Sequence, residues 1–100
     1  MKPLDLNFIC QTLGLPMPSE NQPVSRIVTD SRDIQDGDVF FALAGERFDA
    51  HDFVEDVLAA GATAVVVSRE DCAALKGALK VDDTLVALQK LAKAWRENVN

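Results

Sequence analysis

The chain has 100 residues, which is enough for one small domain with a modest hydrophobic core. Hydrophobic residues make up 48% of it and charged residues 26%, as is ordinary for a soluble globular protein. The net charge of -6 argues against binding to nucleic acids or anionic membranes through overall charge, so an anionic ligand would need a local basic site. Arg26, Arg32 and Arg47 are candidates for such a site because they flank two polar stretches of the chain.

No apolar run approaches the roughly 20 residues that a membrane-spanning helix requires. The first residues also lack the long apolar stretch of a signal peptide. We therefore expect a cytoplasmic protein that has no membrane span and does not bind nucleic acid.

The first predicted element is a short helix. Asp5 can cap its start, and Gly14 followed by Pro16 can end it. Between them, apolar side chains recur at the i, i+3, i+4, i+7 spacing of one helix face: Leu6, Ile9, Cys10 and Leu13. The proline-containing residues 15–23 then form a surface connection.

Two strands are predicted next, over residues 24–29 and 39–43, with a polar loop between them. Asp36, Gly37 and Asp38 are a turn signal just before the second strand. Apolar residues in this second strand are continuous rather than alternating, which predicts that both faces of the sheet are covered.

A second helix should begin near Asp49 and end at Gly61. Asp49 as N-cap with Asp52 three residues later resembles a capping box with Asp in place of Glu. The spacing predicts a buried stripe of Phe53, Val54, Val57 and Leu58, and a short buried strand follows over residues 64–67.

Ser68 should cap a short helix that Gly77 closes, and residues 79–81 should form the last strand. Asp82 or Asp83 then caps the longest helix. Its predicted buried stripe is Leu85, Leu88, Leu91, Ala92 and Trp95. Strands that alternate with helices predict an α/β domain, with a small, largely parallel sheet of about four strands and helices on both faces.

The two cysteines, Cys10 and Cys72, lie far apart among apolar residues, so we expect free thiols packed in the core. One histidine and two isolated cysteines do not make a metal site. His51 has no neighbouring nucleophile in sequence, and we expect it to make a local hydrogen bond rather than to act in acid–base catalysis.

The loop that contains Asp30, Ser31 and Arg32 could hold a phosphate. Ser31 offers one hydrogen-bond donor, and the guanidinium of Arg32 can donate two parallel hydrogen bonds. The alternative is a simple turn, in which Asp30 binds backbone amides and Arg32 pairs with Asp33 or Asp36. The spacing alone favours the turn.

The loop from Gly45 to Asp49 offers a second set of binding groups. Gly45 gives the backbone freedom, and Glu46 or Asp49 could accept hydrogen bonds from a ribose or a base. Phe48 could stack on a base, and Arg47 could offset diphosphate charge. The alternative is a solvated connection with Phe48 tucked into the core.

These stretches carry a resemblance as an ordered series: residues 30–32, 36–43, 45–53, 61–62, 64–67 and 81–88. Together they resemble the N-terminal domain of the Mur ligases that act late in peptidoglycan precursor synthesis. The chain lacks the G-x-x-x-x-G-K-[ST] motif that cradles ATP phosphates and the G-x-G-x-x-G of dinucleotide-binding folds. The resemblance therefore implies that residues 1–100 form a single N-terminal substrate-binding domain, without the central ATP-binding and C-terminal domains.

The resemblance also implies a ligand, the UDP moiety of UDP-N-acetylmuramoyl-tripeptide. Ser31 is then expected near the diphosphate or ribose, and Glu46, Arg47 and Phe48 at positions that contact the uridine. The full set of expected UDP-binding residues is Asp30, Ser31, Arg32, Gly45, Glu46, Arg47, Phe48 and Asp49. No catalytic residue, metal or cofactor is expected in this chain. ATP and magnesium would serve the full-length enzyme, whose central ATPase domain would be this domain's partner.

Within the family, the match favours the branch that attaches D-alanyl-D-alanine. The branch that adds the third peptide residue is the first alternative. The second is a non-catalytic protein-interaction module on the same fold. That last alternative is tested by whether Ser31, Arg32 and Arg47 line one open cleft or pair internally. The domain alone should be inactive as a ligase.

Overall fold

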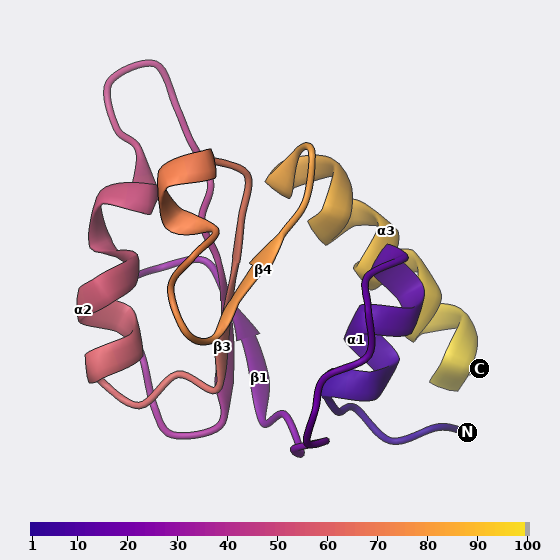
Figure 1. The fold of residues 1–100 in the computed structure, drawn as a ribbon. Coiled ribbons are helices and arrows are strands. Elements are labelled where there is room, and N and C mark those ends of the chain that lie inside the picture. Colours follow the sequence, from indigo (N-terminus) through magenta and orange to yellow (C-terminus); the bar gives the residue numbers. More distant parts are fainter. Residues whose placement is uncertain (100) are drawn as a thin grey trace.

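The computed structural model describes residues 1–99, which form a four-stranded sheet between two layers of helices (Figure 1). The strands are β1 (Arg26–Val28), β2 (Asp38–Phe41), β3 (Ala64–Val67) and β4 (Ala78–Lys80). They lie in the order β1-β2-β3-β4, and every neighbouring pair is parallel. The predicted α/β fold with a parallel sheet is therefore confirmed.

Helices α1 (Leu6–Leu13) and α3 (Thr84–Val99) cover one face of the sheet. The other face is covered by the 3₁₀ helix η1 (Ala50–Phe53), by α2 (Val54–Ala59) and by the short 3₁₀ helix η2 (Glu70–Cys72). Side chains of β2 divide between two cores, since Val39 and Phe41 pack under α1 and α3 while Phe40 packs under α2. Both faces are buried, which explains the continuous apolar run of this strand.

Several predicted boundaries agree with the structure. The Asp5 carboxylate accepts a hydrogen bond from the Phe8 N–H at 2.8 Å and caps α1, and Gly14 ends it with a left-handed φ of 71°. Strand β3 has the predicted bounds. At α3, Asp83 is the cap, because its carboxylate accepts a hydrogen bond from the Val86 N–H at 3.1 Å.

The predicted second helix is wrong in its first turn. Residues after Asp49 form the 3₁₀ helix η1 before α2 begins, and the Asp49 carboxylate binds the N–H of His51 instead of that of Asp52. The capping box therefore does not form. The tighter 3₁₀ turn also changes the phase of the side chains, so Val54 and Val57 are buried but Phe53 is exposed.

Two other predicted helix features differ. Ser68 does not cap a helix, because η2 begins after Arg69 and the Ser68 N–H is bound by His51. On α3, the buried face is Thr84, Ala87 and Leu91, whereas Leu85 is 52% exposed. This face turns toward α1, where Trp95 meets Phe8 edge-on at a centroid distance of 5.4 Å.

Candidate functional site

Two loops meet at the carboxyl edge of the sheet, one after β1 and one after β2. Because parallel strands end at the same edge, residues 29–32 and 44–49 lie side by side although they are distant in sequence. Together with η1 they enclose a cavity of about 460 Å³. Its lining consists of Thr29, Asp30, Ser31, Arg32, Phe48 and Phe53.

One wall of this cavity is a turn built on Asp30. Its carboxylate accepts hydrogen bonds from the Arg32 backbone N–H at 2.9 Å, from Nε at 3.1 Å and from Nη2 at 3.2 Å. The hydrogen bonds from Arg32 hold the pKa of Asp30 below its ordinary value. Arg32 thus pairs with Asp30, not with Asp33 or Asp36, and its side chain remains 89% exposed. Its guanidinium is held in place yet open to solvent.

Another wall is aromatic. The rings of Phe48 and Phe53 are stacked with centroids 5.5 Å apart and an interplanar angle of 19°. Phe48 is 56% exposed and is not tucked into the core. The cavity lining thus combines a flat apolar surface with a turn that carries a hydroxyl and a guanidinium.

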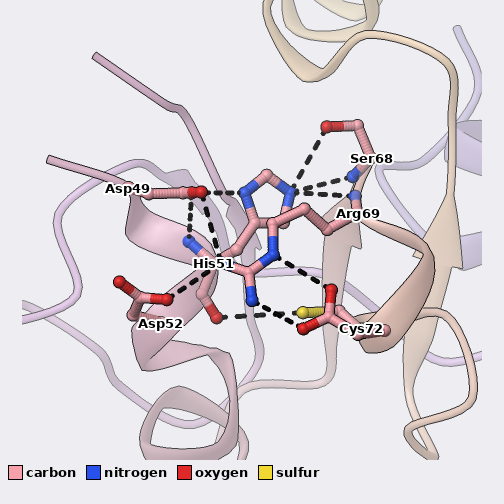
Figure 2. Close-up of polar contacts among 7 residues, drawn as sticks. Asp49, His51, Asp52, Ser68, Arg69 and Cys72 are labelled. Atoms are coloured by element: carbon pink, nitrogen blue, oxygen red, sulfur yellow. Dashed lines mark hydrogen bonds and ion pairs between the residues drawn. The ribbon is translucent and has the colours of Figure 1, made fainter. Parts of the chain in front are cut away.

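Half-buried Asp49 and buried His51 form a polar link (Figure 2). The Asp49 carboxylate accepts a hydrogen bond from the His51 N–H at 2.9 Å, lies 2.6 Å from Nδ1, and accepts from Arg69 Nη1 at 3.2 Å. Burial of Asp49 works to raise its pKa, but these hydrogen bonds outweigh burial and the pKa lies below its ordinary value. The predicted local hydrogen bonding of His51 is confirmed.

Asp49, His51 and Ser68 line up like a catalytic triad, yet the arrangement cannot act as one. The backbone N–H of Ser68 donates to His51 Nε2 at 2.9 Å, whereas the Ser68 hydroxyl lies 3.4 Å away. The only lone pair of Nε2 is therefore already used, so this nitrogen cannot take a proton from the hydroxyl. The group is a structural link rather than a nucleophilic site.

The other predicted site residues, Gly45, Glu46, Arg47 and Asp49, are not part of the cavity lining. Glu46 and Arg47 are exposed in the loop between Gly45 and Phe48, whose ends are joined by a Gly45 N–H to Phe48 carbonyl hydrogen bond of 2.6 Å. Arg26 is far from this loop in the sheet, at the start of β1, where it binds Asp38. The three arginines therefore do not form one basic site.

Thr29 and Phe53 line the cavity but were not among the predicted site residues. Thr29 directly precedes the Asp30 turn, so its place in the sequence could have identified it as a residue of the cavity lining. Phe53 was assigned to the core on helical spacing, which the 3₁₀ turn of η1 invalidates.

Within residues 1–99, no group of three or more histidine, cysteine, aspartate or glutamate side chains is placed to hold a metal ion. Cys10 and Cys72 are free and buried, as predicted, and burial raises the pKa of both thiols. The same residues contain no helix that is long and apolar enough to cross a membrane.

Comparisons with known proteins give a consistent family. Residues 23–96 match the family described as "Mur ligase family, catalytic domain". The UDP-N-acetylmuramoyl-tripeptide–D-alanyl-D-alanine ligase of Synechocystis is 44% identical over 81 residues, which is 79% of this chain and 18% of that protein. Ligases for 2,6-diaminopimelate also match, at 37–38% identity.

Solved structures of similar proteins agree with the sequence comparisons. MurF from Acinetobacter baumannii superposes with a TM-score of 0.78 and 36% identity, covering 98% of this chain and 22% of that one. MurF from Thermotoga maritima in complex with ADP gives a TM-score of 0.68 and 35% identity over 75% of this chain and 17% of that one. The chain thus spans about a fifth of the length of the relatives it matches. Since the family match covers most of its residues, the chain belongs to the Mur ligase family.

Proposed function

We propose that this chain binds the UDP end of UDP-N-acetylmuramoyl-tripeptide, as the N-terminal domain of a ligase that adds D-alanyl-D-alanine. One observation carries the proposal. The Asp30–Arg32 turn and the stacked Phe48–Phe53 pair line the same open cavity. Phosphate-binding and base-stacking groups are thereby combined at the carboxyl edge of a parallel sheet, where ligands of such folds commonly bind.

The chemistry of each wall suits one part of UDP. The exposed face of Phe48 can stack on uracil. Ser31 can donate a hydrogen bond to the diphosphate or ribose, and Thr29 offers a second hydroxyl nearby. Arg47, exposed next to Phe48 in the other loop, can approach the diphosphate.

Arg32 remains able to bind phosphate although it is paired with Asp30. A guanidinium carries five N–H donors, and the side chain uses only Nε and Nη2 on Asp30 among residues 1–99. Nη1 is left to donate to a ligand oxygen. In this proposal Asp30 and Asp49 hold their loops in place, since the carboxylates of both are already engaged.

The chain would contribute affinity and orientation rather than bond formation. Its sequence contains no loop for ATP phosphates, so the ATP and magnesium of the proposed ligase would be held by a central domain. Binding the nucleotide end holds the distant peptide carboxylate against that domain. We also propose that the protein is located in the cytoplasm.

The equivalent domain of the ligase that adds the third peptide residue is the second candidate, because 2,6-diaminopimelate ligases also match this chain. Both candidates bind the same UDP group, so the cavity does not separate them. An activity assay of the longer protein with D-alanyl-D-alanine and with 2,6-diaminopimelate does. Activity with 2,6-diaminopimelate alone would replace the first candidate by the second.

The binding proposal is tested by an amide-resolved NMR titration with UDP and then with UDP-N-acetylmuramoyl-tripeptide. We expect saturable shifts at residues 29–32 and 45–53. Phe48→Ala should weaken UDP binding by about tenfold, the effect of losing one base-stacking contact, and Arg47→Ala should weaken it less. Val86→Ala is the matched control, because Val86 is similarly exposed, at 58%, but lies on α3.

A lack of binding would decide against the proposal. Flat spectra with both ligands, in this chain and in a longer protein with the central and C-terminal domains, would refute the UDP assignment. The protein-interaction module would then be the better interpretation.

A further inference from the structure

We infer that His51 is a positioning residue for the 44–49 loop, because its imidazole ties Asp49 at the end of this loop to the Ser68 backbone at the end of β3. The inference rests on the proposed function, since the loop carries Phe48 and Arg47. His51 touches no ligand in this scheme and acts only through Asp49.

The hydrogen bonds determine which tautomer His51 adopts. A backbone N–H can only donate, so the Ser68 N–H at 2.9 Å requires Nε2 to be an acceptor. The hydrogen of the neutral ring is therefore on Nδ1, where it donates to the Asp49 carboxylate 2.6 Å away. The Arg69 N–H approaches the same Nε2 at 3.4 Å, and the residue is only 3% exposed. The ring is thus a fixed, water-excluded bridge between two elements.

The loop depends on this bridge because its own contacts are few. Ala44 and Asp49 pair as an isolated bridge, and the Ala50 N–H donates to the Leu43 carbonyl at 3.0 Å. The loop is closed by the Gly45 to Phe48 hydrogen bond. Glu46, Arg47 and Phe48 themselves are exposed. The position of Phe48 is therefore set by its stacking on Phe53 and by the ends of the loop, where Asp49 is anchored.

Charged groups at η1 and in the segment after β3 lie around the bridge. Asp49 faces Nδ1, while Arg69 holds Asp49, Asp52 and Asp71 together, and the Cys72 thiol contacts the His51 carbonyl at 3.9 Å (Figure 2). Protonation would set a second N–H of the ring against the Ser68 N–H, so it would break the link to β3. The bridge works only with neutral His51.

A loosened loop must be ordered when the ligand binds, and this ordering lowers affinity. We compare His51→Leu, which removes both hydrogen bonds, with His51→Gln, whose planar amide offers one acceptor and one donor. Leu91→Ala is the control for general destabilisation, since Leu91 is buried on the inner face of α3. We measure ¹⁵N relaxation at residues 45–48 without ligand, and UDP affinity by NMR titration.

His51→Leu should increase fast motion at residues 45–48 and weaken UDP binding by about tenfold. His51→Gln should return most of the loop rigidity and most of the UDP affinity. Leu91→Ala should lower Tm and change neither property. A role in stability alone would not produce this pattern.

Unchanged loop motion in folded His51→Leu would overturn the inference. Where His51→Leu fails to fold, Asp49→Asn replaces it, because the loss of the carboxylate should loosen the same loop. Failure of the unsubstituted chain to bind UDP would instead count against the proposed function. The relaxation measurements need no ligand and still decide whether His51 anchors the loop.

Discussion

The two edges of the sheet each hold an arginine–aspartate pair, and the pairs differ in burial. At the amino edge, Arg26 and Asp38 are register partners that open β1 and β2, with Nη2 2.6 Å from Oδ2. Asp38 is fully buried and also accepts the Gln35 N–H at 2.8 Å. At the carboxyl edge, the side chains of Arg32 and Asp30 are 89% and 49% exposed.

This difference in burial separates charges that stabilise the fold from charges that are available to a ligand. The Asp38 carboxylate is inside the fold, so removing its partners would leave a buried charge unpaired, which is costly. The exposed pair is screened by water and contributes little to stability. Its partners can therefore be exchanged for ligand oxygens without unfolding the domain. Burial, rather than residue type, decides which arginine is available to a ligand.

The largest expected effect is a stability difference between the two edges. Asp38→Ala should lower the free energy of unfolding by about 2 kcal/mol, because it leaves the Gln35 N–H without its acceptor and Arg26 with only Asp33. Asp30→Ala is the matched control and should leave stability nearly unchanged. Urea unfolding followed by circular dichroism measures both, and equal losses would contradict the comparison.

The sequence predicted those features that depend on neighbouring residues. The caps of α1, the strand β3 and the polar loops at the ends of β1 and β2 all follow from local spacing. Phe53 and Leu85 were wrongly placed in the core because helical phase depends on where a helix begins and what it packs against. Local spacing does not determine either of these.

Long-range polar links were beyond prediction for a different reason. His51 and Ser68 are 17 residues apart, and a backbone N–H as partner leaves no trace in residue type. The Arg26–Asp38 pair joins two strands through their register, which the sequence alone did not specify. Arg26 consequently looked like a candidate ligand-binding group, although the structure commits it to Asp38 and Asp33.

Acid should reduce the stability that the Arg26–Asp38 pair contributes at the amino edge of the sheet. The hydrogen bond from Arg26 holds the pKa of Asp38 below its ordinary value of 3.8, against the effect of burial and with help from the Gln35 N–H. A carboxyl with a lowered folded-state pKa contributes stability above its unfolded pKa and loses it as the pH falls through the folded one.

We therefore expect stability from this pair to be complete above about pH 5 and to fall below about pH 4. Thermal unfolding from pH 7 to pH 2.5 measures this for the unsubstituted chain and for Asp38→Asn. The amide variant should be less stable at pH 7 and should lose less stability in acid. Parallel pH curves for the two proteins would refute the assignment.

The smallest expected effect concerns salt at the carboxyl edge. Exposed charges are screened over about 8–10 Å at ordinary ionic strength, so attraction between the UDP diphosphate and Arg32 or Arg47 should weaken as salt is added. We expect a several-fold loss of UDP affinity between about 0.05 and 0.5 M NaCl, with a smaller change in unfolding free energy because Asp38 is buried. Uridine, which lacks phosphates, is the control and should bind with nearly constant affinity. Equal salt dependence for UDP and uridine would mean that stacking on Phe48, rather than the exposed arginines, dominates recognition at this edge.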